Sequence, residues 1–168
     1  MKKTILGLVI LFFVSNPASA QSRRAENLRG LKGVRLVIMF GRADAMDEAQ
    51  RPAVLKLLEE DAKAKFTKAG IPLLQFGNEI EEAGSPQLIV TITLDKPNGN
   101  VYPLVTDMRL LQRVRFVRDP SIEADVPTWQ TYGVGAPQFT VQMIRSQIAS
   151  EIDQFLDDYV AANPKIGP

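Results

Sequence analysis

The feature that most constrains this chain is the alternation of apolar and polar residues along several separate stretches. The longest runs from Val101 to Val117, and its apolar even positions are Tyr102, Leu104, Met108, Leu110, Val114 and Phe116. A period of two is typical of a strand with one buried face. At ~3.3 Å per residue this stretch would reach about 56 Å, well beyond the ~17–20 Å of a usual strand. We therefore expect it to bend, to bulge or to overhang its sheet.

Four further stretches are predicted to be strands, at 34–40, 73–76, 87–94 and 122–134. Residues 96–100 contain proline, asparagine and glycine, and Asp119, Pro120 and Ser121 form a second group of turn residues. Such clusters between alternating runs indicate turns. The last three strands should therefore follow one another as hairpins.

Two stretches instead carry apolar residues at helical spacing. The first begins at Asp47 or at Pro52 and has its apolar stripe at Val54, Leu57, Leu58, Ala62, Phe66 and Ala69. Gly70 supplies a left-handed end and Pro72 prevents continuation. The second spans about 138–162, with its stripe at Val141, Ile144, Ile148, Ile152, Phe155, Leu156 and Tyr159, and ends before Asn163 and Pro164.

The predicted order is β-α-β-β-β-β-α, which places the chain in the α+β class. A mainly antiparallel sheet with both helices packed on one face buries the two stripes most simply. We expect one domain over residues 30–164, preceded by a flexible lead-in over 21–29.

Residues 1–20 have the order of a secretory signal peptide. Lys2 and Lys3 precede an uncharged apolar stretch, which ends at the small residues Ala18, Ser19 and Ala20. We expect cleavage after Ala20; the alternative is an uncleaved anchor, although the stretch is short for a membrane span of about 20 residues. The mature chain should be periplasmic or secreted, with no transmembrane segment.

Composition excludes several classes of function. Loss of Lys2 and Lys3 from the 20 basic residues leaves 18 against 19 acidic residues, a net charge of −1, which gives no overall attraction for nucleic acid. The chain contains no histidine and no cysteine, so triads based on either residue and zinc-finger-like sites are excluded. We expect no cofactor, and an enzyme would have to rely on carboxylate chemistry, on Ser-Lys chemistry, or on Mg²⁺ or Ca²⁺ bound by oxygen ligands.

Arginines on the longest alternating stretch are the main candidate for a binding site. Arg109, Arg113 and Arg115 share one parity, and Arg118 lies at the end of the stretch. Guanidinium groups at this spacing could bind phosphates or carboxylates bidentately. The alternative, which we prefer, is a solvated sheet face whose charges prevent aggregation. Trp129 could join this surface or stack on a sugar, but a core position is more typical of a lone tryptophan on a strand.

Other side chains with catalytic or metal-binding chemistry show no selective pattern. A glycosidase pair would have to come from Glu59, Glu60, Glu79, Glu81, Glu82, Glu123 or Glu151, and their spacing selects no two of them. Neither Asp44 with Asp47 nor Asp157 with Asp158 has the spacing of a calcium loop. The glycines of residues 132–135 lack the Lys-Ser/Thr of a phosphate loop and indicate a strand end.

Several motifs carry a resemblance that spans nearly the whole mature chain. They are Leu28–Val34, Lys68–Pro72, Arg118–Ile122, Thr128–Trp129, Asp153–Tyr159 and Asn163–Lys165. Together they resemble a family of exported bacterial proteins of uncharacterised activity, which implies an exported location and no particular chemistry. The element order is also loosely similar to small envelope domains such as the TolB amino-terminal domain, which contact other envelope proteins.

These observations favour an exported, non-enzymatic binding or accessory domain. Its partner would be an envelope protein or, with less support, an anionic polymer bound on a sheet face. The rival hypotheses are a small carboxylate-dependent hydrolase and an inhibitor or immunity-type protein. A hydrolase needs a concave pocket that holds two carboxyl groups, whereas a binding domain needs only a flat or grooved surface.

Overall fold

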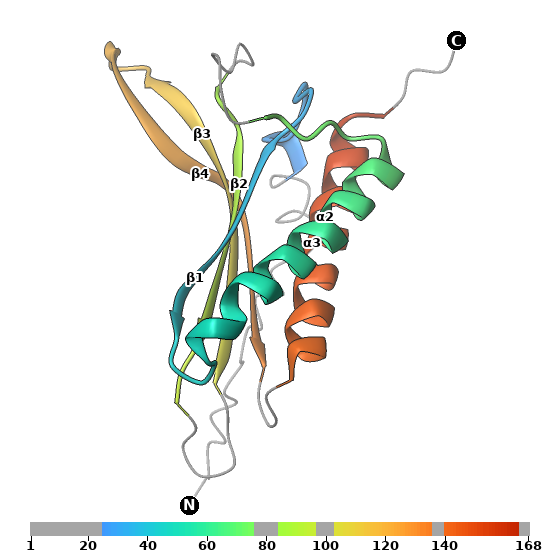
Figure 1. The fold of residues 1–168 in the computed structure, drawn as a ribbon. Coiled ribbons are helices and arrows are strands. Elements are labelled where there is room, and N and C mark those ends of the chain that lie inside the picture. Colours follow the sequence, from blue (N-terminus) through green and yellow to red (C-terminus); the bar gives the residue numbers. More distant parts are fainter. Residues whose placement is uncertain (1–24, 76–83, 97–102, 136–139, 165–168) are drawn as a thin grey trace, which may run out of the picture.

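The computed structural model describes residues 25–75, 84–96, 103–135 and 140–164. Within them lie the strands and helices β1 (Arg35–Ala43), η1 (Glu48–Gln50), α2 (Arg51–Ala69), β2 (Gln87–Leu94), β3 (Leu104–Phe116), β4 (Asp119–Gly135) and α3 (Val141–Ala162). The sheet order is β1-β2-β3-β4; β1 and β2 are parallel, and the other two pairs are antiparallel. Both helices lie on the same side of the sheet (Figure 1). The predicted α+β class with two helices on one face is confirmed.

Helix boundaries follow the local signals in the sequence. Asp47 caps the 3-10 turn η1 by accepting a hydrogen bond from the Ala49 amide, and Pro52 lies in the first turn of α2. Gly70 ends α2 at φ 71°, where its N–H donates to the carbonyls of Phe66 and Thr67. Thr140 caps α3 by accepting from the Met143 amide. Aspartate and threonine caps and a left-handed glycine stabilise helix ends because they satisfy backbone groups that the helix leaves unpaired.

The core lies between the sheet and the two helices. Phe66 from α2 and Phe155 from α3 are fully buried, with ring centroids 5.9 Å apart. The sheet contributes alternate side chains, which include the fully buried Leu88, Val90, Ile92 and Leu94 of β2. Asp61 of α2 accepts two hydrogen bonds from Arg145 of α3, at 2.7 and 2.9 Å, which ties the outer sides of the helices together.

The packed domain extends further toward the amino terminus than the sequence suggests. Residues 25–29 fall in the predicted flexible lead-in, yet Leu28 is fully buried. Its carbonyl accepts a hydrogen bond from Asn163, which follows α3, and the neighbouring Asn27 donates to the Thr128 carbonyl. Burial of one leucine and these long-range hydrogen bonds hold this segment against the domain.

Three local expectations need correction. The strand expected at 73–76 is reduced to a single bridge between Val34 and Leu73, and residue 76 lies outside the described residues. The chain reverses at residues 117–118 rather than at 119–121, because β4 already begins at Asp119. Leu57 is 41% exposed, since the buried side of α2 is narrower than the predicted stripe.

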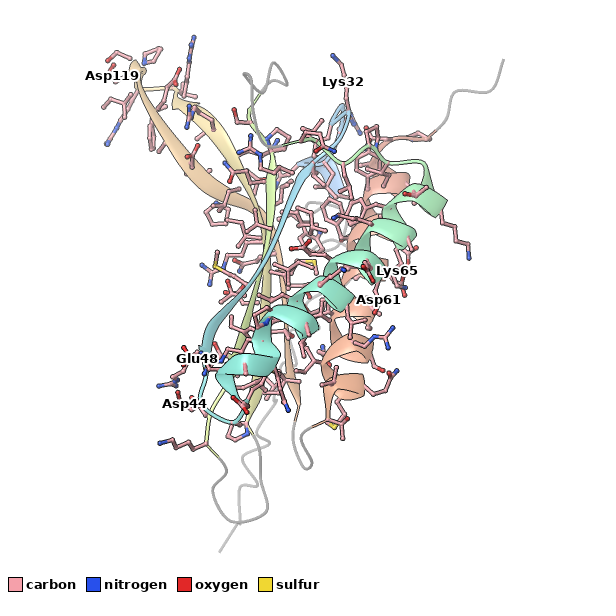
Figure 2. All side chains as sticks on the ribbon, in the orientation of Figure 1. Lys32, Asp44, Glu48, Asp61, Lys65 and Asp119 are labelled. Atoms are coloured by element: carbon pink, nitrogen blue, oxygen red, sulfur yellow. The ribbon has the colours of Figure 1, made fainter. Side chains whose placement is uncertain are left out.

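The β3–β4 hairpin is longer than the sheet that it belongs to. β2 pairs with β3 only from Leu104 to Leu111, whereas β3 and β4 continue to pair as far as Phe116. We call this outer part, residues 112–126, the arm. The arm projects from the sheet away from the helices (Figure 1), and Asp119 lies at its far end (Figure 2). Of the three forms that the long strand could take, the structure shows an overhang; the extra residue of the register irregularity between Leu110 and Leu111 lies on the partner strand β4.

Candidate binding surface

Among the described residues, no helix or strand covers the second face of the sheet (Figure 1). Alternate residues of β1, β3 and β4 point toward this second face, because the residues between them, such as Ile38, Met108 and Trp129, belong to the core. The strongly exposed apolar side chains of this face are Met39, Val105, Tyr132 and Val134, at 43, 38, 74 and 73%. The register places Val105 beside Val134, so part of this apolar surface is contiguous.

Three of the four candidate arginines lie on this same face, and each is paired with a carboxylate. Arg109 donates to Asp107 on its own strand, with the Nε to Oδ1 distance at 2.9 Å. Arg113 donates across the hairpin to both oxygens of Asp125, at 3.1 and 3.3 Å. Arg115 donates to Glu123 at 2.7 Å, and Arg118 lies in the turn at the tip of the arm.

These pairs change what the arginines can bind. Hydrogen bonds from the guanidinium groups to Asp107 and Asp125 raise the pKa values of Arg109 and Arg113 above their ordinary values. Each arginine keeps its charge but already has a carboxylate partner, so an anionic ligand would have to displace that partner. The face is therefore a mixture of apolar groups and neutralised ion pairs rather than a positively charged patch.

Trp129 lies on the opposite side of the sheet and is only 2% exposed. Its Nε1 donates to Asp158 of α3 at 2.8 Å, and its ring meets Phe155 edge-on with centroids 5.1 Å apart. At the register irregularity between Leu110 and Leu111, residue 128 of β4 has no opposite residue on β3, and Trp129 lies opposite Leu110. This bulge decides which face receives Trp129, so the structure corrects its inclusion in the candidate surface.

The sequence patterns did not single out a buried polar cluster beneath α3. Glu151 is 4% exposed and accepts hydrogen bonds from Thr106 Oγ1 and from Gln147 Nε2. A Cβ added to Gly133 would lie 1.9 Å from Gln147 Nε2 and 2.5 Å from Glu151 Oε1, so glycine makes room for this cluster. The only signal in the sequence was the position of Glu151 between Ile148 and Ile152 on the apolar stripe.

One hollow of the surface brings two carboxylates together. Asp153 and Asp157 of α3 line a space of about 490 Å³ beside Lys65 of α2, and Lys65 forms an ion pair with Asp153. An open hollow of about 810 Å³ is lined, among the described residues, by Pro127–Tyr132 on β4, and none of these six carries a carboxyl group. Glu79, Glu81 and Glu82 lie outside the described residues. Within the described ranges no cluster of three or more possible metal ligands occurs, and no helix is long and apolar enough to cross a membrane.

Comparisons with known proteins assign no family to this chain. No family model matches the chain, and no curated protein matches it. One solved structure, a minor lipoprotein from Acinetobacter baumannii, is similar at 14% identity and a TM-score of 0.30. The match covers 79% of this chain and 93% of that one. A similarity at this level carries no argument about function.

Proposed function

We propose that this chain is an exported, non-enzymatic domain that binds a protein partner through the helix-free face of its sheet. The observation that carries the proposal is the composition of that face. Exposed Met39, Val105, Tyr132 and Val134 share this face with arginines that are already paired with carboxylates. Protein interfaces combine apolar and aromatic groups with arginine in this way.

The same observation favours a protein over an anionic polymer. Binding to a polyanion depends on cations that release counterions, and its affinity falls steeply with salt. On the arm, Arg113 and Arg115 face Asp125 and Glu123, so the charges cancel locally. A protein partner can use the apolar groups and form new hydrogen bonds at the edges of these pairs.

The exported location rests on the pattern of residues 1–20. An exported protein cleaved after Ala20 would begin at Gln21, in the periplasm or outside the cell. Intact-mass measurement of the protein from the exported fraction should show the loss of residues 1–20. A full-length mass in that soluble fraction would contradict cleavage.

Capture experiments test the binding surface directly. The exported protein is immobilised and incubated with the envelope fraction of the producing cell, and captured proteins are identified after cross-linking. We expect the double variant Met39→Ser/Val105→Ser to lose most of the captured partner, because it removes exposed apolar contacts without touching the core. Leu57→Ser is the matched control, since Leu57 is 41% exposed on α2, on the helix-covered side.

Two outcomes would contradict the proposal. Equal capture by the double variant and the wild type would show that the partner does not use this face. The second outcome is salt-sensitive retention of the wild type on an anionic polymer, together with loss of this retention in Arg113→Ser/Arg115→Ser. That result would favour the polymer as the partner.

A further inference from the structure

The two edges of the sheet differ in how well they are protected against pairing with another strand. Near the start of β1, the neighbouring Val34 forms a bridge with Leu73, and its amide and carbonyl are bonded to the segment at residues 72–74. Further along, β1 contains a register irregularity between Phe40 and Arg42, and Arg42 forms an ion pair with Asp95. Covering segments, bulges and charges are the usual means by which natural proteins prevent edge-to-edge association.

The opposite edge, β4, has such protection over only part of its length. Its arm end contains Pro120, Glu123, Asp125 and Pro127, whereas residues 128–135 contain no proline and no charged residue. Asn27 reaches the carbonyl of Thr128 at the start of this neutral stretch. Among the described residues, β4 pairs with β3 and with no second strand. Trp129 and Gln130 make further interactions, so we call only residues 131–135 the neutral edge.

Side chains and shape at the neutral edge also favour association. Tyr132 and Val134 are 74 and 73% exposed, and they are neighbours on the helix-free side of the strand. The open hollow of about 810 Å³ extends along part of this edge, over Pro127–Tyr132. Two large apolar side chains on an edge strand without charges are a known source of strand pairing between molecules.

We propose that the neutral edge pairs antiparallel with the same edge of a second copy of this chain, forming a twofold dimer with one continuous sheet. A twofold interface requires a self-complementary surface. An uncharged stretch meets this requirement, because two copies bring no like charges together. This inference goes beyond the proposed function, since it concerns the edge and a different occupant.

The register of the dimer follows from the side chains. Pairing centred on Gly133 places Tyr132 opposite Val134 of the second copy, and the symmetry repeats this contact. Aromatic residues opposite β-branched residues are among the favourable cross-strand pairs. Gly133 itself has no side chain to obstruct the close approach of the two backbones. Because the paired stretch is short, the buried area should lie at the low end of the range for specific interfaces. The dimer should therefore dissociate on dilution.

Sedimentation velocity across a dilution series tests the proposal on the exported protein. We expect a monomer at low concentration and a dimer at high concentration for the wild type. Tyr132→Lys/Val134→Lys should remain monomeric throughout, because the lysines set like charges against each other across the twofold axis. Val117→Lys is the matched control and should dimerise normally, since Val117 is 99% exposed at the tip of the arm.

Amide hydrogen exchange locates the interface independently of the variants. In the wild type, amides of residues 131–135 should exchange more slowly as the concentration rises. A wild type that stays monomeric up to its solubility limit would overturn the proposal. A dimer whose protected amides lie outside the neutral edge would also overturn it. The same holds if the neutral edge is protected only when a captured envelope protein is present.

Discussion

The β3–β4 hairpin consists of two regions that have the same sequence pattern but different surroundings. In the body of the sheet, residues 104–111 of β3 are paired on both sides and lie beneath the helices. In the arm, β3 has β4 as its only strand partner among the described residues, and the hairpin projects away from the helices (Figure 1). Leu110 is fully buried, whereas Phe116, which has the same parity, is 38% exposed.

This difference shows that alternation specifies a strand and its two sides but not whether either side is buried. Burial needs a second layer, and α2 and α3 supply it only above the body of the sheet. Val114 and Phe116 were expected to face the helices; they have the correct parity but lie beyond them. The buried side chains of this hairpin therefore lie in the body of the sheet, and those of the arm remain exposed or half-buried.

The sharpest way to test this comparison is to truncate one phenylalanine in each region. Phe155→Ala should lower the free energy of unfolding by about 3–5 kcal/mol, because it removes a fully buried ring and leaves a cavity. Phe116→Ala in the arm should lower it by about 1 kcal/mol or less, since the ring keeps much of its exposure. Chemical denaturation of both variants measures the two values. Similar losses for both would mean that the arm is part of the cooperative core.

A smaller effect is expected from the hydrogen bond that joins β4 to α3. Trp129→Phe removes the donor to Asp158, which is 3% exposed, and leaves a buried carboxylate without this partner. Loss of such a hydrogen bond costs about 1–3 kcal/mol. The double variant Trp129→Phe/Asp158→Leu should recover part of this loss in the same denaturation experiment. No recovery would show that the missing indole volume, rather than the unpaired carboxylate, causes the loss.

The pH dependence of stability should report on the contact between the helices. Hydrogen bonds from Arg145 lower the pKa of Asp61 below its ordinary value. The folded state therefore gains stability from ionised Asp61 above the unfolded carboxyl pKa of about 3.9, and loses it as the pH falls through the lower folded pKa. Both side chains are more than a third exposed, so the gain is about 0–1 kcal/mol.

Denaturation of the wild type and Asp61→Asn at neutral and acidic pH checks this expectation. The variant should be less stable near pH 7, and the difference should shrink as the solution is acidified below the ordinary carboxyl range. Arg145→Gln is the matched control and should show the same convergence. A difference that is constant with pH would mean that the ion pair does not contribute.

The smallest effect on stability is expected in the arm. Arg113→Ser/Arg115→Ser should change the thermal midpoint very little, because ion pairs between exposed side chains contribute little to stability. Differential scanning calorimetry measures the midpoint. A large decrease would show that the pairs hold the two strands of the arm together and that the arginines are structural.

Much of the fold was predictable because its signals are local. Gly70 and Pro72 ended α2 where the sequence indicated, and Asn163 follows the last residue of α3. Alternation in residues 87–94 matches β2 in both boundaries and burial. The strand at 73–76 was overestimated, since its short apolar run had only Val34 to pair with.

The candidate surface was predictable only in part, because its composition depends on register. The common parity of Arg109, Arg113 and Arg115 followed from the period of two, and the structure keeps them on one face. Their carboxylate partners Glu123 and Asp125 come from the other strand, so they depend on how the hairpin is aligned. A single bulged residue, Thr128, moved Trp129 to the opposite face.

The sequence by itself determined the elements, their order and the parity of their side chains, because propensity, caps and periodicity act within a few residues. Only the tertiary structure decided that Leu28 enters the core, that Glu151 is buried beside Gly133, and that α2 and α3 do not extend over the arm. Those outcomes depend on which distant segments meet and on where each helix ends above the sheet. No local pattern encodes these distances, since they arise only when the layers pack.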